Sequence, residues 1–226
     1  MQKIAFENNL AETAFLRSED GRYSLRWFTP TVEVDLCGHA TLAAAFVLMN
    51  FVNPEMKSVD FYTSSGILTV FRDENLYIMD FPRRKPSPID SPLLLEKALG
   101  CRVLETHISR DLLVLVDNED CIKNLRPDIE LLQKIDDGFA VIVTAGGEDC
   151  DFVSRFFAPK AGVNEDPVTG SSHSTLIPFW SERLDKRKLT AKQLSKRGGT
   201  LYCEDLGDRV KISGNAICYL KGNIEV

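Results

Sequence analysis

The sequence lacks any apolar stretch close to the roughly 20 residues that are needed to span a bilayer. Its first ten residues, MQKIAFENNL, contain no apolar core of a signal peptide. No run of Lys and Arg exceeds three residues and the net charge is −6, so the chain has no basic field that could hold phosphates. These absences predict a soluble, cytoplasmic protein that binds neither membranes nor nucleic acids.

Paired cysteines are also missing. The six cysteines form no C-x-x-C pair, and no histidine lies at the spacing of a zinc ligand. This argues against a metal site and a disulfide framework, and it fits reduced thiols in a reducing compartment. With 44% hydrophobic and 27% charged residues, the 226-residue chain can bury an ordinary core as one large domain or as two small lobes.

The chain contains an internal repeat. RWFTP at residues 26–30 matches RFFAP at residues 155–159, and each reads as a short aromatic strand stopped by proline. Downstream of each match a glycine, Gly38 or Gly170, opens a run of small and apolar residues that predicts a buried helix. Gly66 and Gly199 then begin alternating strands joined by acidic turns, which predict antiparallel hairpins. The alternative is chance similarity between short patterns, but three matched elements in the same order favour duplication.

Small residues along a helix let strands approach closely, so each half is expected to wrap an antiparallel sheet around one helix. Residues 81–88, FPRRKPSP, read as the linker. We therefore predict an α+β fold with a first lobe over residues 1–85 and a second over 86–226, and we allow that the last strand returns to the first lobe. Residues 92–100 predict a short helix with Ser91 as its N-cap and Gly100 just past its end.

The two predicted helix starts are candidate binding elements. Helix N termini that open with glycine and small residues present free N–H groups and a partial positive charge, which suit a carboxylate. If the lobes face each other, Gly38 with His39, and Gly170 with Ser171, converge on one anionic substrate. The alternative is an ordinary pair of helix starts, with Ser171 or Ser172 acting only as a cap.

Three titratable residues lie near these helix starts or near a predicted strand. His39 follows Gly38, where the helix dipole is expected to keep the ring neutral near pH 7, although a lone histidine is more often structural. Asp166 lies four residues before Gly170 and could orient a neighbour, or it could be a solvated turn acid or a cap. Glu12 stands among apolar neighbours at the start of a predicted strand, where desolvation could suit it to proton transfer; exposed glutamates are also common there.

Five motifs, in order along most of the chain, closely resemble the PhzF-like family of phenazine biosynthesis proteins. They are NLAETAF at residues 9–15, LRWFTP at 25–30, DLCGHAT at 35–41, EDPVTGS at 165–171 and the Q-x-S-x-R-G-G pattern at 193–199. The resemblance implies the diaminopimelate epimerase-like fold: two pseudo-symmetric lobes, each a curved antiparallel sheet or barrel around a central helix, with the active site between them. It also implies a homodimer that needs no cofactor and no metal.

The resemblance further implies an isomerase. In the family's founding enzyme, a glutamate moves a proton in isomerising dihydro-3-hydroxyanthranilate, with a histidine and an aspartate beside it. By motif position these are Glu12, His39 and Asp166 here, expected within reach of one another, while Gly38, Gly170 and Ser171 would bind the substrate's carboxylate or amine. Related racemases use one cysteine on each lobe. This chain has Cys37 before Gly38 but Thr169 before Gly170, so two-thiol chemistry is disfavoured.

The chain departs from the family pattern at its start. It lacks about forty N-terminal residues that carry a first strand and a Gly-Asn-Pro loop, which would uncover a sheet edge and part of the first lobe's helix. We therefore expect dimerisation or aggregation through this face, near residues 13–16 and 25–28. Two functions stay open: an isomerase acting on a small carboxylated metabolite, and a non-catalytic relative that binds a small molecule or a protein.

Overall fold

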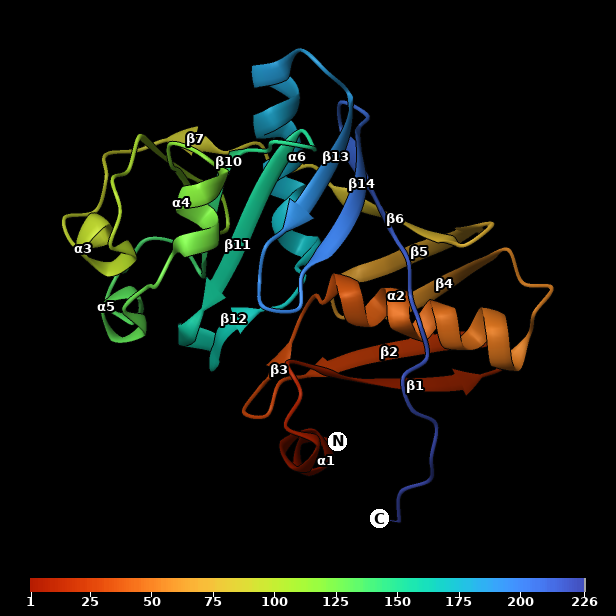
Figure 1. Ribbon diagram of the computed structural model, residues 1–226. Helices are drawn as coiled ribbons and strands as arrows, with labels where there is room; N and C mark the ends of the chain where they lie inside the picture. The colour runs from red at the N-terminus through yellow and green to blue at the C-terminus, as the bar shows by residue number, and fades with distance from the viewer. Residues whose placement is uncertain (226) are drawn as a thin grey trace.

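The computed structural model describes residues 1–225, which form a mixed α+β fold around one 15-stranded sheet (Figure 1). Along the sheet the strands follow the order β1-β2-β4-β5-β6-β15-β14-β13-β11-β10-β9-β8-β7. Two short strands lie off this path: β3 pairs with β2, and β12 pairs with β11. The sheet curves strongly, so that two helices, α2 and α6, each lie in a hollow of its surface. The predicted fold class, two halves that each wrap a curved sheet around a helix, is confirmed.

The first half begins with a short helix and two antiparallel strands. Its elements are α1 (Gln2–Asn8), β1 (Thr13–Glu19), β2 (Arg22–Phe28), β3 (Glu33–Val34), α2 (Gly38–Val47), a π-helical turn η1 (Leu48–Val52), β4 (Ser58–Thr63), β5 (Gly66–Asp73) and β6 (Leu76–Pro82). Strand β2 pairs antiparallel with β1 along one side, and on its other side it pairs antiparallel with β3 and in parallel with β4. Strands β4, β5 and β6 then follow as antiparallel neighbours.

The second half repeats this order. Its elements are β10 (Val141–Gly146), β11 (Phe152–Ala158), a 3-10 turn η2 (Pro159–Ala161), β12 (Val163–Asp166), α6 (Gly170–Leu184), β13 (Lys188–Gln193), β14 (Gly199–Asp205) and β15 (Arg209–Gly214). Strand β11 pairs antiparallel with β10 and β12 and in parallel with β13, just as β2 pairs with β1, β3 and β4. The duplication read from the three sequence matches is therefore confirmed in the topology.

The two halves are joined edge to edge. Strand β15 pairs antiparallel with β6 over six residues, so the ladder runs without a break from one half into the other. The boundary between residues 85 and 86 stays a prediction, because the sheet itself has no gap there. One core cluster also includes buried side chains of both halves, among them Trp27, Phe61, Phe152 and Trp180.

The segment between the two halves in sequence, residues 87–133, adds strands to the same sheet, and we call it the separate layer because it is not part of the repeat. It contains β7 (Ser87–Pro88), α3 (Leu95–Leu99), β8 (Glu105–Ile108), β9 (Leu112–Leu115), α4 (Glu119–Asn124) and α5 (Ile129–Gln133). Strand β9 pairs in parallel with β10, and the layer has its own core cluster. The predicted helix at residues 92–100 is shorter than expected: it begins at Leu95 with Leu94 as N-cap, because Pro92 accepts a turn bond from Leu95. It ends as predicted at Gly100, with φ of 69°.

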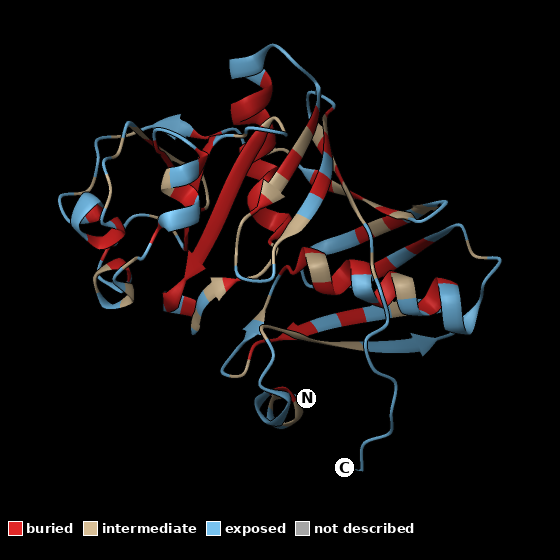
Figure 2. Ribbon diagram, viewed as in Figure 1, coloured by how far each residue is buried: buried red, intermediate tan, exposed pale blue. Residues whose placement is uncertain are grey.

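No helix among residues 1–225 is both long and apolar enough to cross a membrane. The two central helices differ in how far they are buried. Helix α6 is buried from Gly170 to Ser181, whereas α2 leaves Ala43 and Val47 exposed on one side (Figure 2).

Candidate active site

The N termini of α2 and α6 meet where the two halves join. A Cβ atom placed on Gly38 would lie 2.9 Å from the Cα atom of Gly170, and one placed on Gly170 would lie 3.1 Å from the Cα atom of Gly38. Real Cβ atoms are essentially never found closer than 3.0 Å, so a side chain at Gly38 would force the backbone to shift, and at Gly170 the neighbour would have to give way by a few tenths of an ångström. The two glycines thus allow the close approach, and the prediction that the two helix starts converge is confirmed.

Neither helix start is capped by a side chain. The N-cap residues are Cys37 for α2 and Thr169 for α6, and neither side chain accepts a hydrogen bond from the first turn. The Ser172 hydroxyl instead donates to the backbone oxygen of Thr169, at 2.8 Å, and Ser171 lines the pocket in front of the helices. The alternative in which these serines serve only as caps is therefore wrong. Free N–H groups and two helix dipoles favour an anion at this point.

A pocket opens in front of both helix starts. Its lining combines the predicted site residues with an apolar wall. The residues are Glu12, Thr29, Val34, Leu36, Cys37, Gly38, His39, Arg110, Phe139, Phe156, Ala158, Ala161, Val163, Asp166, Thr169, Gly170 and Ser171. All six residues predicted from the sequence therefore line one pocket.

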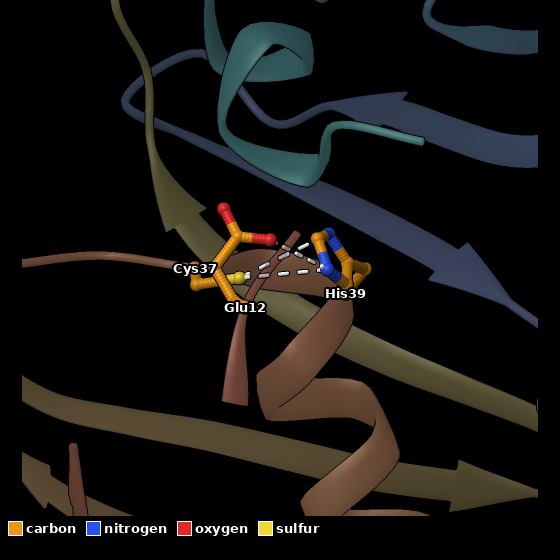
Figure 3. Close-up of side chains that lie close together, drawn as sticks. All are labelled: Glu12, Cys37 and His39. Carbon is orange, nitrogen blue, oxygen red and sulfur yellow. Dashed lines mark hydrogen bonds and ion pairs between the residues drawn. The ribbon is translucent and has the colours of Figure 1, made fainter. Parts of the chain in front are cut away.

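Glu12 and Asp166 both lie close to His39, and Figure 3 shows Glu12 and Cys37 beside the His39 ring. Nε2 of His39 is 3.0 Å from Oε2 of Glu12, and Nδ1 of His39 is 3.9 Å from Oδ1 of Asp166. Glu12 comes from the residue before β1, His39 from the first turn of α2, and Asp166 from the end of β12. The expectation that these groups lie within reach of one another is confirmed, and Glu12 is not on the outer surface: 12% of its side chain is exposed.

The protonation of His39 differs from the sequence-based expectation. Burial alone would lower the pKa of His39, but Cys37, Glu12 and Asp166 oppose this, and the balance raises the pKa well above its ordinary value. Cys37 opposes the effect of burial most strongly, followed by Glu12 and Asp166, while burial raises the pKa of the Cys37 thiol itself. The prediction of a neutral ring is wrong, because Cys37 and the two carboxylates together outweigh burial and the helix dipole.

Asp166 is buried, and only one of its two carboxylate oxygens has a hydrogen-bond partner among the described residues. Its Oδ2 atom accepts a hydrogen bond from the Thr169 hydroxyl at 2.6 Å, whereas its buried Oδ1 atom has no hydrogen-bond partner among residues 1–225. Burial raises the pKa of Asp166, and Glu12 adds to this, while His39 and Thr169 oppose it. The site therefore holds two carboxylates and an imidazole close together.

A buried glutamine fixes the loop that carries Asp166. The Gln193 amide donates to the backbone oxygen of Asp166 at 2.7 Å and accepts from the backbone N–H of Thr169 at 2.7 Å. Ser195 adds a hydrogen bond to the backbone oxygen of Pro167, also at 2.7 Å. The Q-x-S pattern at residues 193–195 was visible in the sequence, but only the fold brings it to the start of α6.

Cys37 completes the cluster. Its Sγ atom lies 3.8 Å from each ring nitrogen of His39, and ligand atoms of Glu12, Cys37 and His39 lie within 4.8 Å of one another. These are residue types that can bind a transition metal. The positive ends of two helices point at the same place, however, so the local field favours an anion over a cation. The position that matches Cys37 in the other half is Thr169, which cannot form a thiolate.

Sequence reasoning missed Arg110. This residue lies in the turn between β8 and β9, outside every motif, and it lines the pocket. Its Nη2 atom is 3.6 Å from Oδ1 of Asp35. No local pattern announces it, because the separate layer is absent from the repeat.

Two α+β halves that meet through paired helix N termini, around a carboxylate–imidazole cluster, define an epimerase-like fold. The chain belongs to the PhzC-PhzF family of phenazine biosynthesis-like proteins, whose family pattern matches residues 1–222. The family resemblance read from the five motifs is thereby confirmed.

Relatives agree with this assignment. An uncharacterized isomerase of Pseudomonas aeruginosa is 48% identical over 227 residues, which cover 100% of this chain and 87% of that protein. A solved structure of a PhzF family protein from Enterococcus faecalis is 47% identical with a TM-score of 0.96, covering 100% of this chain and 86% of the other. A probable proline racemase from Agrobacterium radiobacter shares only 13% identity with a TM-score of 0.59, over 90% of this chain and 73% of that one, and shows the fold alone. Family and fold together support an isomerase or epimerase role.

Proposed function

We propose that this protein is an isomerase of a small carboxylated metabolite and that Glu12 transfers the proton. One observation carries the proposal: the carboxylate of Glu12 lies 3.0 Å from the partly buried imidazole of His39, beside two uncapped helix N termini in a single pocket. Acid–base groups and an anion site are thus combined where one substrate could contact both.

The helix starts would bind the substrate's carboxylate. The N–H groups that follow Gly38 and Gly170, together with the Ser171 hydroxyl, are donors that face the pocket, and both helix dipoles favour negative charge there. This would place a carbon next to the bound carboxylate close to Glu12. The apolar wall, which includes Val34 and Phe156, would exclude water from that carbon.

The reaction would proceed by two proton transfers. Glu12 takes a proton from a substrate carbon, the electron pair of the broken C–H bond moves into the adjoining unsaturated system, and Glu12 returns the proton to another carbon of that system. The charged His39 ring, held by Glu12 and Asp166, would stabilise the negative charge that develops on the substrate. The step conserves protons and electrons, so we propose that it needs no cofactor.

Hydrogen exchange in deuterated water tests this proposal even where the product of the reaction is not identified. We would incubate the protein with a panel of small unsaturated and amino carboxylates and follow deuterium uptake at carbon by NMR. The Glu12→Gln variant should lower the exchange rate by roughly 10²- to 10⁴-fold, the usual contribution of a positioned acid–base group. Glu7→Gln, which changes an exposed glutamate of α1, is the matched control and should leave the rate unchanged.

The outcome also separates the two functions that the sequence left open. Exchange that persists in folded Glu12→Gln protein would remove Glu12 from the reaction. Ligands that bind wild-type protein in the pocket, but exchange no hydrogen under any condition, would instead identify a non-catalytic binding module.

A further inference from the structure

We propose that Arg110 binds a second carboxylate of the substrate, so that the substrate of this site is a small dicarboxylate. The inference deepens the proposed function, because it rests on the first carboxylate being bound at the helix starts. It draws on one side chain that neither the repeat nor the family motifs include. Its basis is the position of Arg110, its unused donors and the charges around it.

Arg110 is held in place at the pocket by its neighbours. The backbone N–H of Phe139 donates to the backbone oxygen of Arg110 at 3.0 Å, and the guanidinium carbon lies 4.6 Å from the centre of the Phe139 ring. Both side chains line the pocket, and 22% of the Arg110 side chain is exposed. A guanidinium stacked on a ring is pre-oriented, so little freedom is lost when it binds a ligand.

The donors of this guanidinium are unused. Among residues 1–225 the Arg110 side chain makes no hydrogen bond, although a guanidinium carries five N–H donors. Its one ion pair within the described part of the chain joins Nη2 to Oδ1 of Asp35 at 3.6 Å, and 64% of the Asp35 side chain is exposed. A long, exposed pair of this kind contributes little and is easily exchanged for a better partner. An entering carboxylate could make two parallel hydrogen bonds in its place.

The charged residues of the pocket make one region unfavourable and another favourable for a second carboxylate of the substrate. Of the described residues that line it, Arg110 alone is a Lys or Arg, while Glu12 and Asp166 make the region around His39 rich in carboxylate. A second carboxylate beside these groups would be repelled, and beside Arg110 it would be attracted. Since Arg110 pairs with Asp35, whose side chain is 64% exposed, its guanidinium lies where the pocket meets the surface. The substrate would therefore extend from the helix starts to Arg110.

Calorimetric titration with flat ring acids tests the inference. The probes are benzoate, which has one carboxylate, and phthalate, isophthalate and terephthalate, which place a second at three spacings. The proteins are wild type, Arg110→Gln, Arg110→Lys and Asp35→Asn, with Arg102→Gln as a matched control because Arg102 is exposed and lies outside the pocket. Unfolding curves of every variant confirm that it is folded.

We expect at least one dicarboxylate to bind wild-type protein more tightly than benzoate. Arg110→Gln should weaken that ligand by roughly 10- to 100-fold, the range for a lost charge-assisted hydrogen-bond pair, and should change benzoate by less than about 2-fold. Arg110→Lys should fall between the two, because an ammonium keeps the charge without the fork. Asp35→Asn should tighten the dicarboxylate by about 2- to 5-fold, since it removes a competing anion.

The opposite signs of the Arg110 and Asp35 variants distinguish ligand binding from a structural ion pair, whose two partners would shift affinity in the same direction. Equal affinity of wild-type protein for benzoate and every dicarboxylate, no binding of any dicarboxylate, or an equal loss for benzoate in Arg110→Gln would overturn the proposal. These are binding measurements, so a failure of proton transfer by Glu12 would leave their result unchanged and be recognised separately.

Discussion

The two halves of this protein share a frame and differ in the groups that the frame presents. The residue after each helix-starting glycine is His39 in the first half and Ser171 in the second. The residue just before the first strand is Glu12 in one half and Ala140 in the other, as the matching registers of β1 with β2 and β10 with β11 show. Duplication therefore fixes where side chains point, and single substitutions decide which of them can do chemistry.

Asp166 of the second half also has no counterpart of the same type in the first half. It lies four residues before Gly170, and the matching position four residues before Gly38 is Val34. The first half thus contributes a carboxylate and an imidazole, the second contributes a carboxylate and a hydroxyl, and the four meet only because the helix starts touch. A symmetric pair of identical groups would favour two-base chemistry, whereas this unequal set favours one proton-carrying group supported by others.

The halves also differ at their outer edges. Strand β10 is covered on its outer side by β9, with β8 and β7 beyond it, whereas β1 is the terminal strand of the sheet at the other end. Figure 2 shows the consequence: β11 is buried along its whole length, while the far end of β1 is exposed. The prediction that residues 25–28 form part of a bare surface is wrong, because β2 lies between β1 and β4 and its Leu25 and Trp27 are buried.

The bare edge of β1 yields the prediction with the largest expected effect, which is self-association of the first half. Leu16 of β1 and Val52 of η1 have exposed fractions of 37% and 61%. Burial of about 400 Å² of such surface would contribute roughly 10 kcal/mol before the costs of association. Sedimentation at micromolar concentration should show a dimer, and Leu16→Lys with Val52→Lys should convert it to monomer. Leu93→Lys, a fully exposed site in the separate layer, is the control.

A soluble wild-type monomer would contradict this prediction. A dimer that survives both lysine substitutions would show that association uses another face, and the free edge of β1 would then need a different explanation.

A second prediction concerns a buried acid that the first half has no counterpart for. Asp111, at the start of β9, is 1% exposed, and its Oδ1 atom has no hydrogen-bond partner among residues 1–225. Burial raises its pKa from 3.8 to about 6, against the opposing effect of Arg110 and Arg84. The folded protein therefore favours the protonated acid. The stability that Asp111 contributes is complete below pH about 4 and is lost as the pH rises through about 6.

Asp111→Asn should remove this dependence. At about 1.4 kcal/mol for each pH unit, the wild-type free energy of unfolding should fall by roughly 3 kcal/mol relative to the variant between pH 4 and pH 7. Urea unfolding at several pH values measures it, with Asp137→Asn as the control because Asp137 is exposed. Parallel pH profiles for wild type and Asp111→Asn would contradict the prediction.

The repeated part of the fold could be predicted from the sequence, and the separate layer could not. Matches such as Arg26 with Arg155 and Gly38 with Gly170 support the same element in both halves, because two copies of one fold must satisfy the same geometry. The layer of β7 to β9 and α3 to α5 occurs once, so each of its short elements had to be judged by local propensity alone. Its one predicted helix began three residues late, since the turn at Pro92 forms without continuing into the helix.

The same division holds for the site. Glu12, His39 and Asp166 were found by motif position, but the charge on His39 was not, because it depends on distances to two carboxylates that are remote in sequence. The position of Arg110 in the pocket and the role of Gln193 could not be predicted for the same reason, since both depend on contacts with residues that are remote in sequence. Residue types can be read from a sequence, whereas the electrostatic balance among them requires their arrangement.

A third prediction tests the contact between the halves. Gly38→Ala and Gly170→Ala each place a methyl group against the opposite glycine, so each should lower the free energy of unfolding by about 1–3 kcal/mol, as overpacking does. Gly146→Ala is the control, because nothing lies within 4 Å of its added Cβ atom. Urea unfolding should show losses of similar size for the two sites. A loss at one glycine alone would mean that only one helix start is fixed in place.

The smallest expected effect compares one ion pair that occurs in both halves. Arg26 makes two hydrogen bonds to Glu33, both of 2.7 Å, and Arg155 makes two to Glu165, of 2.7 and 2.9 Å. Each guanidinium also lies over the ring two residues further along its strand. The copies differ in burial: the exposed side-chain fraction is 51% for Arg26 and 11% for Arg155.

This difference in burial makes an Arg-to-Lys pair informative, because lysine keeps the charge and loses the planar fork. Arg155 also donates to the backbone oxygens of Ile122 and Leu125, which come from the separate layer. Arg155→Lys leaves these acceptors unsatisfied and should lower the free energy of unfolding by roughly 1–3 kcal/mol. Arg26→Lys should leave the free energy of unfolding almost unchanged, because water can replace the hydrogen bonds that the guanidinium made to Glu33 at this exposed site. Equal losses in urea unfolding would mean that the layer does not set the energetics of the second half. Unequal losses would show that the duplicated contact is needed for stability only where the separate layer covers it.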